Sequence, residues 1–164
     1  MITFQEFCSR LDESSLSRIK SKSDKGGMAT MSASRADKSA KENSARAKQL
    51  DRDIKGKGLP GATKVTGSYI EKDKKTGKET KVKERSHVVT SGKKGKRKFK
   101  KAVKALGKKY GQDSVLTQTK KTGTLHRTRK GGLDTKGMNV GKFKPQGKNP
   151  YGQSQIKGKT FAYK

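Results

Sequence analysis

Apolar residues recur at the spacing of an α-helix in two stretches of the chain. The first runs from Ala29 to Ile54, but most of its apolar stripe is alanine, so its early part predicts only a marginal helix. The second covers about residues 95–110 and has a single apolar face, which predicts an amphipathic helix that ends at Gly111 or earlier, at Gly107. That face is formed by Phe99, Val103, Leu106 and Tyr110.

Strand-like stretches come in pairs joined by short polar turns. "ATKVTGSYIE" and "KVKERSHVVTS" flank the turn "KDKKTGKE" and predict one hairpin, and "SVLTQT" and "TLHRT" joined by "KKTG" predict a second. The predicted fold class is therefore α+β: a small antiparallel sheet of two hairpins packs against the amphipathic helix, and long flexible basic arms extend from it. We expect one core made of Leu50, Ile54, Val65, Tyr69, Val89, Phe99, Val103, Leu106, Val115 and Leu125.

The pattern divides the chain into four segments. Residues 1–13 are a short acidic segment, read as a removable targeting segment, and residues 14–48 are a Ser/Lys/Gly/Ala-rich flexible linker followed by the marginal helix. Residues 49–130 form the small α+β domain. Residues 131–164 form a Gly/Lys-rich basic tail with one or two short strands.

Charge points to an anionic partner. Among 164 residues there are 43 Lys and Arg against 14 Asp and Glu, a net charge of +29, and only 27% of the residues are hydrophobic. Nucleic acid, DNA or RNA held through phosphate contacts, is the expected partner, with an acidic membrane surface or an acidic protein as alternatives. The expected nucleic-acid-binding residues are Lys93, Lys94, Lys96, Arg97, Lys98, Lys100, Lys101, Lys104, Lys108, Lys109, Arg127, Arg129 and Lys130.

Catalytic chemistry finds little support in the sequence. The two histidines, His87 and His126, lie in expected strands without a nearby pair of carboxylates, and the one cysteine, Cys8, lies in the N-terminal segment. No metal site can be assembled from two histidines and scattered acids. The sequence therefore predicts a protein that is not an enzyme and that uses no cofactor, with no catalytic residues.

The N-terminus has its own pattern. Thr3 and Glu6 match a capping box, and apolar residues follow at helical spacing, which predicts a short amphipathic helix. "MITFQEF" resembles the capsid-targeting start of internal head proteins of large contractile-tailed phages. The resemblance implies docking on a prohead scaffold and cleavage after Glu13, before Ser14, in a Leu-x-Glu sequence. The implied targeting residues are Phe4, Glu6, Phe7 and Leu11.

The remainder of the chain, from "ARAKQLDRDIKGKGLPGATKVTGSYIE" onward, resembles uncharacterised basic proteins of cyanobacterial myoviruses. Together, charge and resemblance predict a non-enzymatic internal virion protein that binds nucleic acid without reading its sequence and resides in the phage head after assembly in the host cytoplasm. The alternative is a phage effector that binds a host protein or RNA.

Overall fold

The computed structural model of the chain describes residues 16–73, 75–130, 137–145, 152–156 and 159–163. Its helices are the segment 16–25, α2 (Ala40–Gly56) and α3 (Lys96–Lys109). Its strands are β1 (Met28–Ser32), β2 (Thr63–Lys72), β3 (Glu79–Thr90), β4 (Ser114–Gln118), β5 (Gly123–Arg127), β6 (Gly137–Gly141), β7 (Phe143–Pro145), β8 (Gly152–Ile156) and β9 (Lys159–Tyr163).

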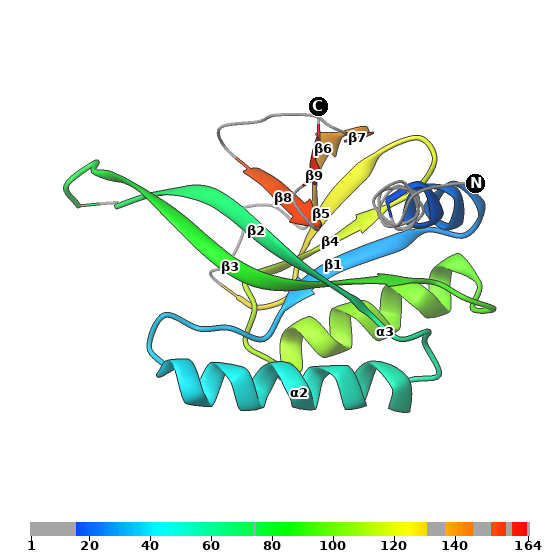
Figure 1. Cartoon of the computed structure of the whole chain (residues 1–164), viewed down its shortest axis with the longest axis horizontal. Coiled ribbons are helices and arrows are strands. Elements are labelled where there is room, and N and C mark those ends of the chain that lie inside the picture. Colours follow the sequence, from blue (N-terminus) through cyan, green and yellow to red (C-terminus); the bar gives the residue numbers. More distant parts are fainter. Residues whose placement is uncertain (1–15, 74, 131–136, 146–151, 157–158, 164) are drawn as a thin grey trace, which may run out of the picture.

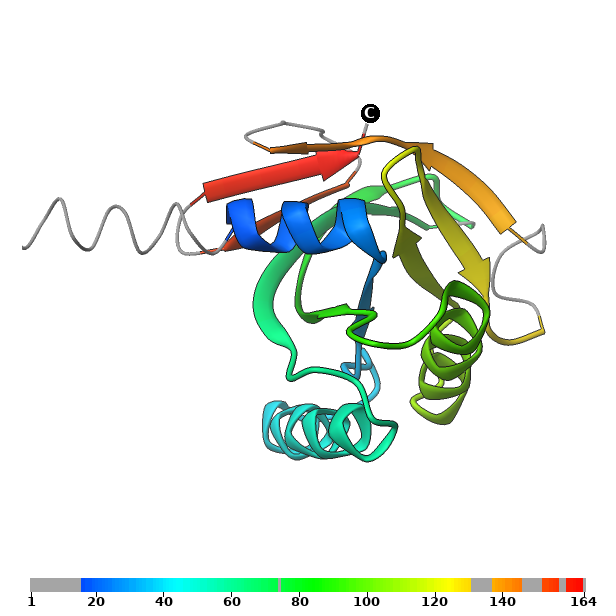
Figure 2. The same ribbon diagram turned by 90° about the vertical axis from the view of Figure 1, so that its right-hand side faces the viewer.

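All nine described strands belong to one sheet, in the order β6-β5-β4-β1-β3-β2-β8-β9-β7, and every pairing is antiparallel. The sheet is strongly twisted, and α2 and α3 lie together on one side of it (Figure 1). We call this side the helix face. The opposite side is the inner face, and helix 16–25 lies within its curve, beside the C-terminal strands (Figure 2).

The α+β class is confirmed, but the sheet is larger than two hairpins. Both expected hairpins are present, as β2–β3 and β4–β5, and β1 joins them by pairing with β3 on one side and β4 on the other. The expected basic tail contributes four strands rather than one or two. The segment 14–48, expected to be a flexible linker followed by a marginal helix, contains helix 16–25 and strand β1.

The helical pattern from Ala29 to Ile54 was half right. Its first part is strand β1, because Ala29 and Ala33, four residues apart, fit one face of a buried strand as well as one face of a helix. α2 begins only after Ser39, whose side chain accepts a hydrogen bond from the Glu42 backbone N–H while Glu42 accepts one from the Ser39 N–H. This capping box satisfies backbone donors that a helix start leaves open. Leu50 and Ile54 anchor the end of α2, as expected.

The helix face carries the larger core. Seven of the ten expected core residues are buried together there: Leu50, Ile54, Val89, Phe99, Val103, Leu106 and Val115. α3 approaches the sheet closely at Gly107, where an added Cβ atom would lie 2.4 Å from Cγ1 of Val115 and 2.9 Å from Cγ2 of Thr128. A glycine in the last turn of α3 thus allows close packing that a side chain would prevent.

A second core lies on the inner face, so the expectation of one core was wrong. Val65 belongs to it, with Leu16, Ile19, Met28, Val88 and Phe143. Tyr163 packs against this cluster, and its ring meets that of Phe143 edge-to-face at a centroid distance of 6.0 Å. Leu125 is only partly buried, and the side chain of Tyr69 lies outside the described residues.

Replacing Gly107 by alanine should destabilise the protein, although alanine is normally the better helix former by about 1 kcal/mol. The new methyl group would overlap Val115 and Thr128, and overpacking of this kind costs about 1–3 kcal/mol. Gly56→Ala is the matched control, because an added Cβ there meets nothing within 4 Å. Urea unfolding should show Gly107→Ala less stable and Gly56→Ala unchanged or more stable. Equal midpoints for the two variants would contradict the close packing of α3.

Candidate functional site

Strand β3 presents different chemistry on its two faces. His87 and Val89 point to the helix face and are buried beneath it. Val88, Ser86 and Glu84 point to the inner face, because side chains alternate along a strand. Burial decreases along this inner row, from Val88 at 2% exposed and Ser86 at 9% to the half-buried Glu84. The row therefore passes from the apolar inner core to a polar, partly accessible end.

Glu84 lies opposite two small residues. Its Cα partner across the sheet is Gly67 on β2, which in turn pairs with Ser154 on β8. Directly opposed residues share a face, so the carboxylate and the Ser154 hydroxyl flank a position without a side chain. A Cβ added at Gly67 would contact Oγ of Ser86 at 3.5 Å and Oγ of Ser154 at 3.8 Å. Of the carboxylates whose side chains the structure describes, Glu84 is the one on the inner face of the sheet.

Further polar groups on the inner face lie near its C-terminal strands. Gln118 is 3% exposed and donates from Nε2 to the Thr119 carbonyl, while its Oε1 is buried without a hydrogen-bond partner among the described residues. Gly123 allows both Gln118 and the ring of Tyr163 to approach, since an added Cβ would lie 2.8 Å from Oε1 and 2.9 Å from Cδ1 of the tyrosine. Burial raises the pKa of Tyr163, so its phenol stays protonated at neutral pH.

The two histidines lie on the helix face of the sheet. Nε2 of His87 lies 3.3 Å from Oδ1 of Asp51 on α2, whose other oxygen lies 3.2 Å from Nζ of Lys64. Burial lowers the pKa of His87, Lys64 lowers it further and Asp51 opposes both, so the ring is neutral at neutral pH. His126 bonds Thr117 at 2.7 Å, and burial with the nearby Lys100 lowers its pKa too. His87 is 1% exposed, which places it out of reach of a ligand.

A second polar cluster joins α2 to the end of α3. The Tyr110 hydroxyl donates to Oδ2 of Asp53 at 2.6 Å, and Nζ of Lys109 lies 2.7 Å from the same oxygen. Arg46 donates to the carbonyls of Ala33 and Tyr110, and its guanidinium lies 5.5 Å from the centre of the tyrosine ring. Hydrogen bonds from Lys109 and Tyr110 hold the pKa of Asp53 below its ordinary value. These groups satisfy one another, so the cluster is a clamp between helices.

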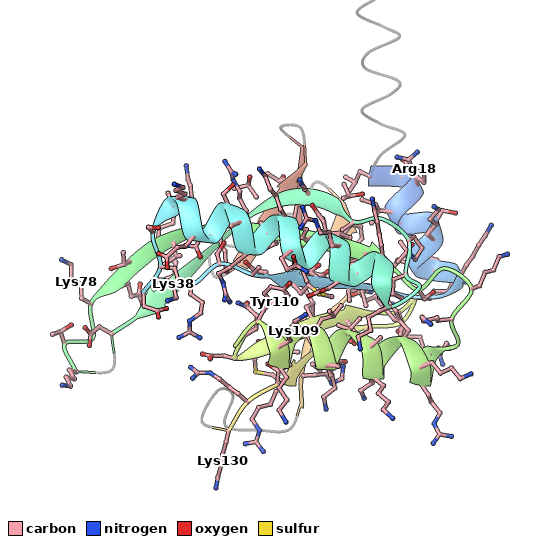
Figure 3. All side chains as sticks on the ribbon, turned by 90° about the horizontal axis from the view of Figure 1, so that it is seen from below. Arg18, Lys38, Lys78, Lys109, Tyr110 and Lys130 are labelled. Atoms are coloured by element: carbon pink, nitrogen blue, oxygen red, sulfur yellow. The ribbon has the colours of Figure 1, made fainter. Side chains whose placement is uncertain are left out.

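The expected nucleic-acid-binding residues gather along α3, the loop before it and the end of β5. Most project outward, and Figure 3 shows nitrogen-tipped side chains around α3, with Lys109 and Tyr110 at its end beside α2. Some have other roles: Lys109 binds Asp53, and Arg129 forms an ion pair with Asp113.

The other expectations concern the N-terminal segment, metal binding and the membrane. The targeting residues Phe4, Glu6, Phe7 and Leu11 and the cleavage pair Glu13 and Ser14 lie outside the described residues. Across the described ranges, no three His, Cys, Asp or Glu side chains gather in a way that could hold a metal ion. No described helix has the length and hydropathy needed to cross a membrane.

Comparison with protein families decides what kind of protein carries this site. The model of the S-adenosylmethionine lyase family matches residues 29–164, which is most of the chain and the whole of the sheet after its first residue. The chain belongs to the S-adenosylmethionine lyase family.

The chain also has a weak likeness to a solved structure. A phage S-adenosylmethionine lyase in complex with S-methyl-5'-thioadenosine aligns with 70% of this chain and 86% of its own, at 18% identity and a TM-score of 0.38. A search of curated proteins gave no match.

Membership of the lyase family corrects most of the functional expectations. The family is one of enzymes, so the expectation of a protein that is not an enzyme was wrong. The same finding overturns the internal virion protein, its DNA or RNA partner, its prohead scaffold and its place in the phage head, together with the effector alternative. The resemblance to capsid-targeting segments misled because it rested on the N-terminal residues, which precede the family match.

Glu84 was not among the site residues expected from the sequence. Catalytic carboxylates were sought as pairs near a histidine, whereas Glu84 is a single acid within the strand "KVKERSHVVTS". Alternation along that strand places Glu84 on the same side as Val82 and Val88, which was a signal that this one acid faces inward.

Stability should fall on acidification through Asp53. Because its folded-state pKa is depressed, Asp53 contributes stability that is present above its ordinary pKa and is lost as the pH falls toward the folded value. Asp53→Asn should reduce stability at neutral pH and flatten the acid limb of a stability–pH curve measured by urea unfolding. Tyr110→Phe, which keeps the ring but removes one donor to Asp53, should give an intermediate slope. If the acid limb of the stability–pH curve has the wild-type slope in both variants, Asp53 does not contribute to the loss of stability at low pH.

Proposed function

We propose that this protein cleaves S-adenosylmethionine, and that it binds this substrate on the inner face of its sheet with Glu84 facing the sulfonium. The family match over residues 29–164 carries the proposal. The choice of face rests on chemistry, because the inner face places the half-buried carboxylate of Glu84 beside the hydroxyl groups of Ser86 and Ser154, around a position without a side chain. His87 on the helix face is buried out of reach of a ligand.

The substrate makes a carboxylate necessary. S-adenosylmethionine carries a positive sulfonium and a positive ammonium against one carboxylate, so it is a cation at neutral pH, and the protein carries +29. A cation approaching such a protein needs a local negative group, and the attraction of an ion pair increases as water is excluded. Glu84, beside the hydroxyl groups of Ser86 and Ser154 and next to the apolar inner core, supplies that group.

Cleavage then follows from the bonding of sulfonium sulfur. When a carbon–sulfur bond breaks, its electron pair stays on sulfur, which becomes a neutral thioether, and the carbon must form a new bond. Without water, it does so either to its neighbouring carbon, which loses a proton to a base, or to an oxygen of the substrate's own carboxylate. Glu84 orients the sulfonium in both routes and is the base available for the first. The carbon product, an alkene or a lactone, identifies the route.

The inner-face assignment predicts a strong loss of activity in Glu84→Gln. The amide keeps the shape of the side chain but removes its charge, and loss of one positioned electrostatic group lowers kcat by about a hundredfold to a thousandfold. Mass spectrometry of S-adenosylmethionine loss and thioether formation measures the effect.

Glu79→Gln is the matched control, because Glu79 lies on the same strand but is exposed and belongs to the alternate row. The control should retain full activity. If Glu84→Gln cleaves S-adenosylmethionine as fast as the wild type does, the site does not lie on this face. If the wild type leaves S-adenosylmethionine intact, the proposed function itself is refuted.

The site of action follows from the substrate. S-adenosylmethionine is a metabolite of the cell interior, so we place the activity in the cytoplasm of the cell in which the protein is made. This assignment rests on the substrate and not on any address within the chain.

Like charge on protein and substrate predicts an unusual salt response. The +29 protein repels a cationic substrate at long range, and the Debye length shortens from about 30 Å at 0.01 M salt to about 10 Å at 0.1 M. The value of kcat/KM should therefore rise with salt over this range. Neutralising Arg97, Lys98, Lys101 and Lys108 together to glutamine should weaken the rise while leaving kcat unchanged. A fall of kcat/KM with added salt would show that local acids outweigh the net charge.

A further inference from the structure

Helix 16–25 lies outside the part of the chain that matches the lyase family, which begins at residue 29. It is nevertheless part of the folded protein. Leu16 is 6% exposed and Ile19 is 5% exposed, and both pack into the inner core with Met28. Ser23, one further turn along, is 2% exposed. The helix therefore covers part of a sheet whose strands lie, apart from Met28, within the residues that match the family.

Helix 16–25 lies beside the proposed substrate position. Val65 contacts the same cluster as the helix and is two residues from Gly67 on β2, facing the same side. Val88 does likewise on β3, in the row that leads through Ser86 to Glu84. Figure 2 shows helix 16–25 within the curve of the sheet, beneath the C-terminal strands and away from α2. The helix thus covers the apolar end of the row whose polar end carries the carboxylate.

The helix is attached to β1 through two glycines. Gly27 has φ +108°, a conformation that favours glycine, and its carbonyl accepts a hydrogen bond from the Ser91 N–H at 3.0 Å. Gly26 packs so closely that an added Cβ would lie 2.3 Å from Oγ of Ser91. The N–H groups of Gly26 and Gly27 donate to the carbonyls of Lys22 and Ser23 at 3.0 Å and 2.9 Å, so the two glycines cap the helix, and the positive φ of Gly27 marks the point at which the chain turns from the helix into β1.

The contacts of the helix with the sheet are of a kind that can open. Its buried side is small, formed by Leu16, Ile19 and Ser23. The ion pair between Lys20 and Asp24, at 2.9 Å, lies within the helix itself and does not tie it to the sheet. Its outward residues line a shallow groove shared with Lys120 of the β4–β5 turn. Among the described residues, the apolar contacts of Leu16 and Ile19 hold the helix against the sheet.

We propose that helix 16–25 is a lid, which turns at Gly26–Gly27 and closes over S-adenosylmethionine on the inner face. This inference rests on the proposed function. A lid serves this chemistry because water near the reacting carbon would compete with the elimination or cyclisation, and because exclusion of water strengthens the attraction between Glu84 and the sulfonium. Leu16 and Ile19 are then positioning residues: they hold the lid closed and do not touch the reacting atoms.

The test compares two single substitutions on one helix of the full-length protein. Ile19→Ser removes a buried anchor, and Lys22→Ser, at an exposed position of the same helix, is the matched control. If Ile19→Ser leaves roughly a tenth of the molecules closed, KM for S-adenosylmethionine rises about tenfold. The control should leave KM and kcat unchanged. Amide hydrogen exchange in the wild type should slow within residues 16–25 when S-adenosylmethionine is added in excess.

Hydrogen exchange also separates a lid from a merely structural helix. Exchange in 16–25 that ignores S-adenosylmethionine, or an Ile19→Ser variant with a lower melting temperature but an unchanged KM, would overturn the lid. If Ile19→Ser also unfolds α2 and α3, as their own exchange would show, the wild-type response of 16–25 to S-adenosylmethionine decides. Absence of cleavage by the wild type would overturn the proposed function, while protection of 16–25 by the bound compound would still support closure.

Discussion

Strand β3 is the element on which both layers of the protein depend. It lies in the middle of the sheet between β1 and β2, and its residues alternate between two environments that must both be right. His87 and Val89 are buried under α2 and α3, while Ser86 and Val88 are buried on the inner face. A shift of one residue in its register would exchange these two sets and place polar side chains in the larger core. The position of Glu84 is therefore fixed by the packing of the residues that follow it.

Local elements followed from the sequence where one pattern dominated. The apolar face of α3 and the two hairpins were predicted because their spacing and turns have one reading. β1 was missed because Ala29 and Ala33, four residues apart, fit one face of a helix as well as one face of a strand, and the burial of β1 comes from partners far along the chain. Helix 16–25 was taken for a linker because only Leu16 and Ile19 supply its apolar side. Tertiary packing, not local preference, decided both.

Function was harder to predict because charge dominated the composition. A net charge of +29 is a legitimate argument about long-range electrostatics, and it says little about a site that needs one acid. Glu84 could be placed on a face by alternation, but its neighbours across the sheet, Gly67 and Ser154, come from strands whose pairing no local pattern gives. The candidate site is thus an outcome of sheet topology more than of any motif.

The position of β1 has a consequence for how the chain folds. Its two partners, β3 and β4, both come later in the sequence, so that Met28 pairs with Thr90 and with Gln118. During synthesis the strand emerges first and waits with its apolar side chains uncovered until the β2–β3 hairpin and then β4 have been made. Non-local pairings of this kind slow folding and leave strand edges open to other chains. Helix 16–25, which emerges just before β1 and packs against Met28, gives the waiting segment an early local partner.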